Sequence, residues 1–419
     1  SKFKYNLAVI GLGYVGLPLA IEAANSKLKV AGYDINESVV DSLKKSISHV
    51  EDISDKVLQD ALSKDLIITS DSSVLGDSEY IVISVPTPLT DYQPDLSYVE
   101  AATKSIAENL KKGQIIILES TTYPGTTLEI VKPILEKNSN LVAGEDFLLG
   151  YSPERIDPGN KEWTFKNTPK IVSGINETSL KKISEFYNSI IDEVVEVSGT
   201  REAEMVKLVE NTYRQVNIAM VNELAILSNM LDIDIWEVVD AAKTKPFGFQ
   251  SFRPGPGVGG HCIPIDPKYL SFKTRQIGQP VRFVELAQEI NNSMPNYVIS
   301  RISELMNKKE ILLKNSKILL LGVAYKKDIG DIRESPAIDI IESLLEKSAE
   351  VSFYDPYVDE LIVNKESILK EQDLESISNY DMVIIHTPHT SFSKIDFENI
   401  KSLIFDTTGS FTISNAERI

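Results

Sequence analysis

The chain has 419 residues, a length that suggests roughly two to three domains. Its formal net charge of −18 argues against nucleic acid and anionic membrane surfaces as partners. No apolar run approaches the ~18 residues that would span a bilayer. The single cysteine cannot form an internal disulfide, and no separate signal-peptide region precedes the first apolar run, so we expect a cytoplasmic protein.

A dinucleotide-binding signature opens the chain. The apolar run Leu7–Ile10 predicts a buried parallel strand, and Gly11-Leu12-Gly13-Tyr14-Val15-Gly16 follows it directly, before a helical pattern. A second predicted strand, 29–33, ends in Asp34, which lies 18 residues past Gly16. That spacing is close to the ~20 residues expected for the acid that binds the adenosine ribose. A glycine-rich turn in an unrelated α/β fold is the alternative, and the combination of strand, glycines, helix and acid disfavours it.

Asp34 also indicates which dinucleotide would bind. Its carboxylate would repel a 2′-phosphate, and no arginine follows it in Ile35-Asn36-Glu37. We therefore expect NAD rather than NADP. The residues expected to hold it are Gly11, Gly13, Tyr14, Val15, Gly16 and Asp34.

The order of predicted strands in the first half recurs near the C-terminus. The first-half runs are Leu7–Gly11, Val30–Asp34, Tyr80–Pro88 and Gln114–Thr121, and the later ones are Lys317–Gly322, Val351–Pro356, Asp381–Pro388 and Leu403–Thr408. Helical patterns separate these short apolar runs, which predicts an α/β fold with two Rossmann-like, doubly wound parallel sheets. Because the second copy has Gly322-Val323-Ala324-Tyr325-Lys326 in place of the glycine signature, we expect it to bind a different nucleotide-like ligand.

Between the two halves, the stretch from Arg201 to Leu231 contains neither proline nor glycine, and its apolar residues recur at spacings of three and four. This predicts one long helix of more than about 40 Å, which could join two domains and build a homodimer interface. Further helical patterns lie near Asp234–Lys243 and Arg282–Asn307. We expect an NAD-binding domain at 1–198, a central helical domain with the dimer interface at 199–308, and a second Rossmann-like domain at 309–419.

The loop between these last two helical patterns carries the only cysteine, in Gly259-Gly260-His261-Cys262-Ile263-Pro264-Ile265-Asp266. Glycines let the backbone approach a ligand closely, and a thiolate is a nucleophile toward carbonyl carbon. A lone cysteine is more often an inert, buried small hydrophobe. The dinucleotide signature in the same chain favours the catalytic interpretation. No Cys/His cluster has zinc-ligand spacing, so no metal site is expected.

Over essentially the whole chain, these motifs and their order resemble the UDP-glucose/GDP-mannose dehydrogenase family. The matching segments are Gly11–Gly16, Val85–Pro88, Ser152–Arg155, Lys207 with Asn211, Gly259–Asp266, Tyr325–Asp328 and Arg333–Pro336. The resemblance implies an NAD-dependent nucleotide-sugar 6-dehydrogenase that oxidises the C6 alcohol of the sugar to a carboxylate by two hydride transfers. It also implies that Cys262 captures the intermediate aldehyde as a thiohemiacetal, which becomes a thioester and is hydrolysed.

The resemblance places helper residues on this chemistry. Lys207 and Asn211 are four residues apart on one helix face and would stabilise a developing oxyanion at C6. Asp266 and Thr121 would handle a proton or a water, and Glu154 would act in thioester hydrolysis. Which of Lys207, Asp266 and Glu154 takes the first alcohol proton stays open.

Each helper residue also has a reading without function. Lys207 would then lie on a solvated helix face. Asp266 would be a loop cap before Pro267, and Glu154 would form a surface salt bridge with Arg155.

The resemblance also implies contacts with both ligands. For NAD it adds Val85, Pro86, Thr87, Ser120 and Thr121. For a UDP-sugar, Lys326 and Arg333 carry charges that suit a pyrophosphate, with plain surface charge on a loop as the alternative. Further substrate contacts are expected from Phe147, Leu148, Glu154, Lys207, Asn211, Phe249, Arg253 and Gly259.

The identity of the sugar depends on finer marks. Members that use UDP-glucose or GDP-mannose commonly have a lysine in a C-x-P-K-D pattern, where this chain has Ile265. With His261 and the run Pro254–Gly257, this resembles the N-acetylhexosamine branch. The stretches at 152–160 and 245–249 favour UDP-N-acetylglucosamine, and UDP-N-acetylmannosamine and UDP-glucose stay open as alternatives.

Two other functions fit some of the same motifs. A hydroxy-acid dehydrogenase of the 6-phosphogluconate type would share the first Rossmann domain and a helical middle, but the Cys262 loop and the C-terminal repeat argue against it. A nucleotide-sensing regulatory protein would bind NAD and a UDP-sugar without forming NADH. The intact set of polar residues disfavours that second alternative.

Overall fold

The computed structural model describes residues 2–157, 159–260 and 262–419. The chain forms two compact units. The first comprises Ser1–Glu210 and Lys268–Gln279, and the second comprises Asn211–Pro267 and Pro280–Ile419. Helix α8, Thr200–Met230, begins in the first unit and ends in the second. The long helix predicted for Arg201–Leu231 is therefore confirmed to within one residue at each end.

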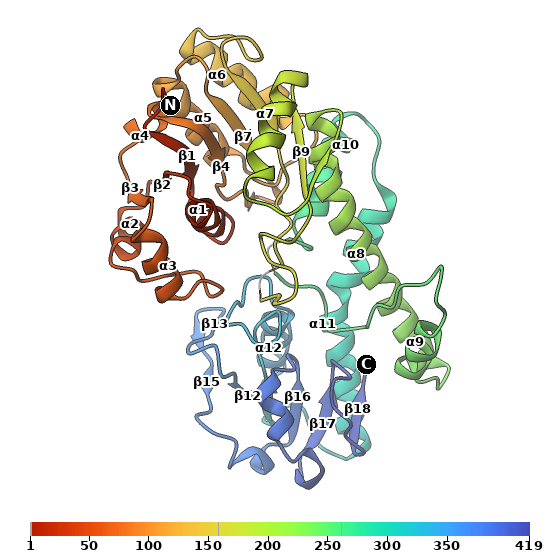
Figure 1. The fold of residues 1–419 in the computed structure, drawn as a ribbon. Coiled ribbons are helices and arrows are strands. Elements are labelled where there is room, and N and C mark those ends of the chain that lie inside the picture. Colours follow the sequence, from red (N-terminus) through yellow and green to blue (C-terminus); the bar gives the residue numbers. More distant parts are fainter. Residues whose placement is uncertain (1, 158, 261) are drawn as a thin grey trace. The chain divides into compact units, whose positions relative to one another are not determined.

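An eight-stranded sheet forms the interior of the first unit (Figure 1). In spatial order its strands are β10 (Val194–Glu196), β9 (Lys170–Gly174), β8 (Leu148–Tyr151), β7 (Ile115–Leu118), β4 (Ser78–Ile83), β1 (Tyr5–Ile10), β2 (Val30–Tyr33) and β3 (Leu66–Thr69). Neighbours are parallel except β8 and β9, which are antiparallel. Strands of a parallel sheet buried on both faces read as continuous apolar runs, and all four residues of β7 are buried.

Helices connect these strands. They are α1 (Gly16–Asn25), α2 (Glu37–Lys44), α3 (Asp55–Leu62), α4 (Ser73–Gly76), α5 (Ser97–Asn109), α6 (Lys132–Ser139) and α7 (Glu177–Asn188), with a π-helical turn η1 (Thr127–Val131) leading into α6. A short hairpin, β5 (Leu89–Thr90) with β6 (Gln93–Pro94), precedes α5. Helix α1 starts at the last glycine of the signature and buries Leu17, Ala20 and Ala24 in the core of this unit.

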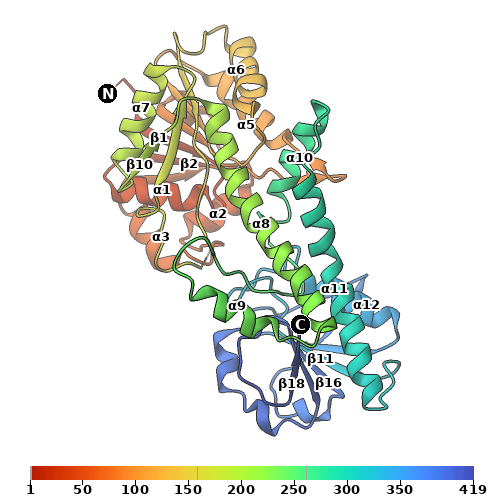
Figure 2. The ribbon, with the colours of Figure 1, turned by 90° about the vertical axis from the view of Figure 1, so that its right-hand side faces the viewer.

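The helices that lie between the two sheets along the chain include one that the sequence did not predict. Helices α9 (Ile235–Lys243) and α11 (Arg282–Lys308) confirm the expected helical patterns. Helix α10 (Asp266–Gln276) starts at the end of the cysteine loop and was not expected. Within the second unit, the later half of α8 lies beside α11, where the Asn222 amide donates to Asn291 Oδ1 at 3.0 Å (Figure 2).

A six-stranded sheet forms the interior of the rest of the second unit. In spatial order its strands are β15 (Leu369–Lys370), β12 (Glu350–Tyr354), β11 (Lys317–Leu321), β16 (Met382–Ile385), β17 (Leu403–Asp406) and β18 (Ala416–Arg418), and all neighbours are parallel. The other elements are α12 (Pro336–Glu346), the hairpin β13 (Ile362–Val363) with β14 (Glu366–Ser367), and the 3₁₀ turns η2 (Ile377–Asn379), η3 (Thr390–Lys394) and η4 (Phe397–Asn399).

The two sheets share one strand order, which confirms the predicted fold class. The first contains β7-β4-β1-β2-β3 and the second β17-β16-β11-β12-β15, with β1 and β11 in the same place. The crossovers differ, because α1 follows β1 after a short glycine turn, whereas residues 322–335 separate β11 from α12. In the described part of the chain, no helix is both long and apolar enough to cross a membrane.

Candidate active site

The expected cofactor residues meet at the carboxyl ends of three adjacent strands in the first unit. Gly11 follows β1, Val85 comes just after β4, and Ser120 comes just after β7. The Ser120 hydroxyl donates to the Val85 carbonyl at 2.7 Å, and the Tyr269 hydroxyl donates to the Thr87 carbonyl. The strand order reverses at β1, and this reversal is where open parallel sheets bind nucleotides.

The three glycines of the signature differ in what surrounds them. Gly11 has a φ of +89°, and a Cβ at Gly16 would lie 1.8 Å from the Gly11 carbonyl oxygen. These two glycines are therefore required by the turn and by close helix–strand packing. A Cβ at Gly13 would meet nothing within 4 Å, so the space beside Gly13 is open to a ligand. This is the division of roles that a pyrophosphate-binding turn requires.

Asp34 is anchored beside this turn. Its Oδ2 accepts the Leu12 N–H at 3.0 Å, and its Oδ1 accepts the Asn36 N–H at 2.9 Å. The carboxylate is only half-buried. An acceptor group therefore stands at the end of β2, where the ribose hydroxyls of an adenosine would lie.

The second sheet has an aspartate, Asp355, directly after β12, as Asp34 directly follows β2. The carboxylate of Asp355, however, is buried and bonded to other residues of the chain. Asp355 Oδ2 accepts the Val323 N–H at 2.8 Å, and Oδ1 accepts the Tyr357 N–H at 2.8 Å. His389 Nε2 lies 2.9 Å from Oδ2, while its Nδ1 accepts the Asp328 N–H, so Nε2 carries the proton. Asp355 is completely buried. This gives a physical reason for the second sheet to bind its ligand through other residues.

The segment that follows Thr121 is held by Glu204, a buried carboxyl group that was not expected from the sequence. Glu204 Oε2 accepts the Gly125 N–H at 2.6 Å, and Oε1 accepts both the N–H and the hydroxyl of Thr127, at 2.9 and 2.7 Å. Burial raises the pKa of Glu204 to about 7, against the effect of these donors. Its position three residues before Lys207, on the same helix face, is the signal that could have identified it.

Glu154 lies after β8, and both of its oxygens are engaged. Oε1 accepts the N–H groups of Arg155 at 2.7 Å and Ile156 at 2.6 Å, and Oε2 lies 3.4 Å from Lys170 Nζ. Arg155 pairs instead with Glu210, at 2.6 Å. Because Glu154 is buried, the reading of it as a surface partner of Arg155 is wrong.

The cysteine loop forms the second group of candidate residues, in the second unit. The Cys262 carbonyl accepts the N–H groups of Ile265 at 3.1 Å and Asp266 at 2.7 Å, which closes a turn into α10. The Asn211 side-chain amide donates to Asp266 Oδ2. The structure thus brings two expected catalytic residues together, with Cys262 half-buried one turn before Asp266.

The two glycines before the cysteine pack against the segment expected to bind nucleotide. A Cβ at Gly259 would lie 2.5 Å from Tyr325 Cβ, and one at Gly260 would lie 2.8 Å from the Tyr325 ring. The Gly260 N–H donates to the Arg333 carbonyl at 3.0 Å, and Gly260 has a φ of +88°. Only glycine allows this contact, so the loop is glycine-rich because Tyr325 lies against it.

The expected substrate contacts of the second unit have different surroundings. Arg333 Nε lies 2.9 Å from Asp331 Oδ1, and this fork holds an exposed guanidinium in place, while Lys326 is half-buried. Arg253 pairs with Asp240 of α9 at 2.6 Å. Phe249 is 40 % exposed in the loop before the cysteine.

Lys207 projects from α8 one turn before Asn211. Its side chain is almost fully buried, with 8 % of its surface exposed, so the reading of a solvated helix face is wrong for this residue. A buried lysine is a costly group unless other charges or donors meet it, which makes it a candidate for chemistry rather than solubility.

Two residues expected to contact the substrate lie at the amino end of a strand in the first sheet, whereas the cofactor residues lie at the carboxyl ends of the strands. Phe147 and Leu148 are at the amino end of β8, whereas Glu154 follows its carboxyl end. Phe147 is 1 % exposed and belongs to the interior. Neither residue is retained in the proposed site. His261, expected to mark the substrate class, lies outside the described residues.

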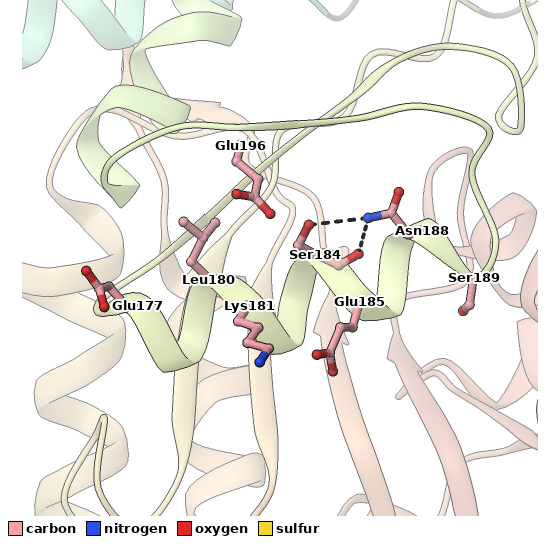
Figure 3. A pocket seen from close by; sticks show the side chains of 8 residues that line it. All are labelled: Glu177, Leu180, Lys181, Ser184, Glu185, Asn188, Ser189 and Glu196. Atoms are coloured by element: carbon pink, nitrogen blue, oxygen red, sulfur yellow. Dashed lines mark hydrogen bonds between the residues drawn. The ribbon is translucent and has the colours of Figure 1, made fainter.

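A hollow of about 620 Å³ lies on the outer face of α7 (Figure 3). Seven of the eight residues that line it are polar, among them Glu177, Lys181, Glu185 and Glu196, and none of the candidate residues above lines it. It is therefore separate from the candidate active site. In the described parts of the chain, no three His, Cys, Asp or Glu side chains are grouped so that they could hold a metal ion.

Comparison with protein families gives three matches in chain order. All three belong to the UDP-glucose/GDP-mannose dehydrogenase family. Its NAD binding domain matches residues 5–191, its central domain 201–293, and its UDP binding domain 319–414.

Individual relatives are similar over nearly the full chain. The chain is 38 % identical to the UDP-N-acetyl-D-glucosamine 6-dehydrogenase of Pseudomonas aeruginosa, over 95 % of this chain and 93 % of the relative. It is 35 % identical to a UDP-N-acetyl-D-mannosamine dehydrogenase of Pyrococcus horikoshii, over 94 % and 92 %. A solved structure of UDP-D-ManNAc dehydrogenase from Pyrococcus horikoshii superimposes with a TM-score of 0.90 at 34 % identity, covering 98 % of both chains.

Proposed function

Because the chain belongs to the UDP-glucose/GDP-mannose dehydrogenase family, an NAD-dependent family of enzymes, we propose that it oxidises C6 of UDP-N-acetylglucosamine to the carboxylate. The observation that carries this proposal is the position of Cys262. It lies in a turn that leads to Asp266, and the Asp266 carboxylate accepts a hydrogen bond from Asn211. Cys262 is the only cysteine in the sequence and so cannot form a disulfide within the chain, which favours a reducing compartment such as the cytoplasm as its location.

The residues of the first unit fit NAD. The open space at Gly13 and the anchored carboxylate of Asp34 are what a dinucleotide requires at this edge of the sheet. We assign the adjacent segments after β4 and β7, with Thr87 and Ser120, to the rest of the cofactor. Bound NAD supplies the hydride acceptor for both oxidations.

Cys262 is proposed as the nucleophile of the second oxidation. Its sulfur bonds to the carbon of the aldehyde, and the carbonyl oxygen takes up a proton. Oxidation of this thiohemiacetal leaves a thioester. Water then bonds to the thioester carbon, the carbon–sulfur bond breaks, and the sulfur regains a proton. Covalent capture keeps the reactive aldehyde from leaving between the two oxidations.

The helper residues are assigned by what surrounds them. Asp266 accepts a hydrogen bond from the Asn211 amide, which orients its carboxylate for proton transfer. The Lys207 ammonium is proposed to stabilise negative charge developing on the C6 oxygen. We assign the orientation of the hydrolytic water to Glu154, with Thr121 as a hydroxyl partner.

Lys326 and Arg333 are proposed to bind the pyrophosphate of the UDP-sugar. Asp331 holds the Arg333 guanidinium in place, and a planar guanidinium suits the recognition of a pyrophosphate. Because Gly259 and Gly260 pack on Tyr325, next to Lys326, nucleotide binding and the position of Cys262 would be coupled within one unit.

UDP-N-acetylglucosamine is expected to give a higher kcat/KM than UDP-glucose. Ile265 stands where relatives that use UDP-glucose commonly have lysine, so the wall beside the sugar is less polar here. A pocket shaped for an acetamido group leaves space and unpaired donors when that group is missing, which costs ~1–3 kcal/mol. The proposal receives support from the relatives named for N-acetylhexosamines.

The test measures NADH formation with UDP-glucose and with the UDP-linked N-acetyl forms of glucosamine, galactosamine and mannosamine side by side. If UDP-glucose is the best of the four, the assignment to the N-acetylhexosamine branch is wrong. If UDP-N-acetylmannosamine is best, the branch stands and the proposed sugar is replaced.

A homodimer is expected, with the apolar stripe of α8 at its interface. Tyr213, Met220, Leu224 and Leu227 follow one another at helical spacing, and between 43 and 49 % of each side chain is exposed. An apolar face of this extent on one chain marks a binding surface.

Light scattering should give the mass of two chains, and Leu227→Asp should reduce it to one. Val57→Asp, on an exposed apolar residue of α3, is the matched control. A wild-type mass of one chain would exclude the dimer.

A further inference from the structure

Three charged side chains lie together inside the first unit. Lys170 Nζ forms ion pairs with Glu119 and, at 3.4 Å, with Glu154 Oε2. The exposed fractions of the three side chains are 5 % for Lys170, 0 % for Glu119 and 10 % for Glu154. The Tyr187 ring covers the ammonium, with its centroid 5.2 Å from Nζ.

Strand register brings these residues together. In the antiparallel pair of β8 and β9, Tyr151 lies opposite Ser173. Glu154 lies three residues beyond Tyr151, past the end of β8, and Lys170 lies three residues before Ser173, at the start of β9. Glu119 directly follows β7, the parallel neighbour of β8. Two strand ends and one strand start thus converge on a single buried ammonium.

Stability alone does not explain such a cluster. Buried charges lose their hydration, and apolar side chains of similar volume often fill such a space at equal or lower cost. Burial raises the pKa of Glu119, while Glu119 and Glu154 together raise the pKa of Lys170 despite the opposing effect of its burial. The lysine is therefore charged in the fold, between two carboxyl groups.

Apolar side chains in place of Lys170 and Glu119 could fill the same space, but they could not orient the Glu154 carboxylate. Two backbone N–H groups hold its Oε1, from Arg155 and Ile156. The ammonium of Lys170 lies 3.4 Å from the other oxygen, Oε2. One carboxylate is thus fixed at both oxygens, by its own loop and by the start of β9.

We infer that Lys170 is a positioning residue for the hydrolysis of the Cys262 thioester, because it fixes the orientation of the Glu154 carboxylate. The inference depends on the role proposed above for Glu154. In that step the attacking water gives a proton to Glu154, and the departing sulfur takes up a proton as the carbon–sulfur bond breaks. The charged or titratable groups that face Glu154 are Lys170, Glu119 and Tyr187, with Arg155 beside it in the chain.

The experiment compares two variants that differ only at the lysine. Glu119→Gln leaves Glu154 with the cation alone, and Glu119→Gln combined with Lys170→Met removes the cation without leaving Glu119 charged and unpaired. The kcat and KM of uronate formation from UDP-N-acetylglucosamine and NAD are measured for each variant. Mass spectrometry of acid-quenched enzyme measures how much substrate is bound to Cys262.

The double variant should turn over about 10- to 100-fold more slowly than Glu119→Gln, as is usual for residues that orient a reacting group. Covalent intermediate should accumulate and KM should change little, because only the hydrolytic step depends on the orientation of Glu154. Adding Lys170→Arg to Glu119→Gln, in place of Lys170→Met, should restore most of the rate.

Equal rates and equal amounts of covalent intermediate for the two variants, with only a lower melting temperature for the double variant, would show that the cluster is structural. If the double variant does not fold, Glu119→Gln combined with Lys170→Gln takes its place, because glutamine keeps a polar side chain at this position. Loss of the charge should then slow hydrolysis and build up covalent intermediate, and an unchanged rate overturns the inference. Wild-type enzyme that forms no NADH would instead refute the proposed function, so the two failures are distinguishable.

Discussion

Replacing Cys262 with serine is expected to reduce uronate formation by at least about 10³-fold, because a serine hydroxyl is a far weaker nucleophile than a thiolate at neutral pH. The change removes little volume, and Gly259 and Gly260 still pack on Tyr325, so the loop should keep its shape. Both ligands should bind with nearly unchanged affinity. Titration calorimetry measures binding, and mass spectrometry measures the uronate.

Cys262→Ala is the matched control, since it removes the nucleophile without leaving a hydroxyl. It should be at least as impaired as the serine variant. Uronate formation by either variant at the wild-type rate would eliminate the covalent mechanism.

NAD should be preferred over NADP by at least ~100-fold in kcat/KM, which corresponds to about 3 kcal/mol. The Asp34 carboxylate is held beside the glycine turn by the Leu12 N–H, where it would meet the ribose hydroxyls and repel a phosphate. Asp34→Asn removes the negative charge and should reduce the preference. The measurement is a pair of kcat/KM values for each variant.

The chain contains a matched control for that test. Asp355 has the same place in the second sheet and the same bond from the residue after a glycine turn, but His389 covers it. Asp355→Asn should leave the ratio between the two cofactors unchanged. Comparable kcat/KM values for NAD and NADP in the wild type would show that Asp34 does not face the ribose.

Local pattern did not reveal β3, β8, β9, β10, β15 or β18, but it was enough to predict the long helix and four adjacent strands of each sheet. The strands are buried on both faces, so runs such as Leu7–Ile10 are apolar throughout, and α8 has no residue that breaks a helix. The glycine signature was equally readable, because a tight turn and a close helix contact leave glycine as the only choice at Gly11 and Gly16.

Contacts between residues that are far apart in the sequence could not be predicted from local pattern. Lys170 and Glu119 are 51 residues apart, and only the order and register of β7, β8 and β9 bring them together. The packing of Tyr325 on Gly259 and Gly260 depends on the second sheet being formed. Phe147 was wrongly expected at the site for a similar reason. Which end of a strand lies at the site depends on the direction of that strand in the sheet, and local pattern does not show this direction.

The most direct test of the account is the number of NADH molecules formed for each molecule of UDP-N-acetylglucosamine consumed to completion. Oxidation of an alcohol through the aldehyde to a carboxylate releases two hydrides, so the account predicts two NADH and one uronate. One NADH for each sugar, with an aldehyde or ketone as the product and no dependence on Cys262, would contradict it.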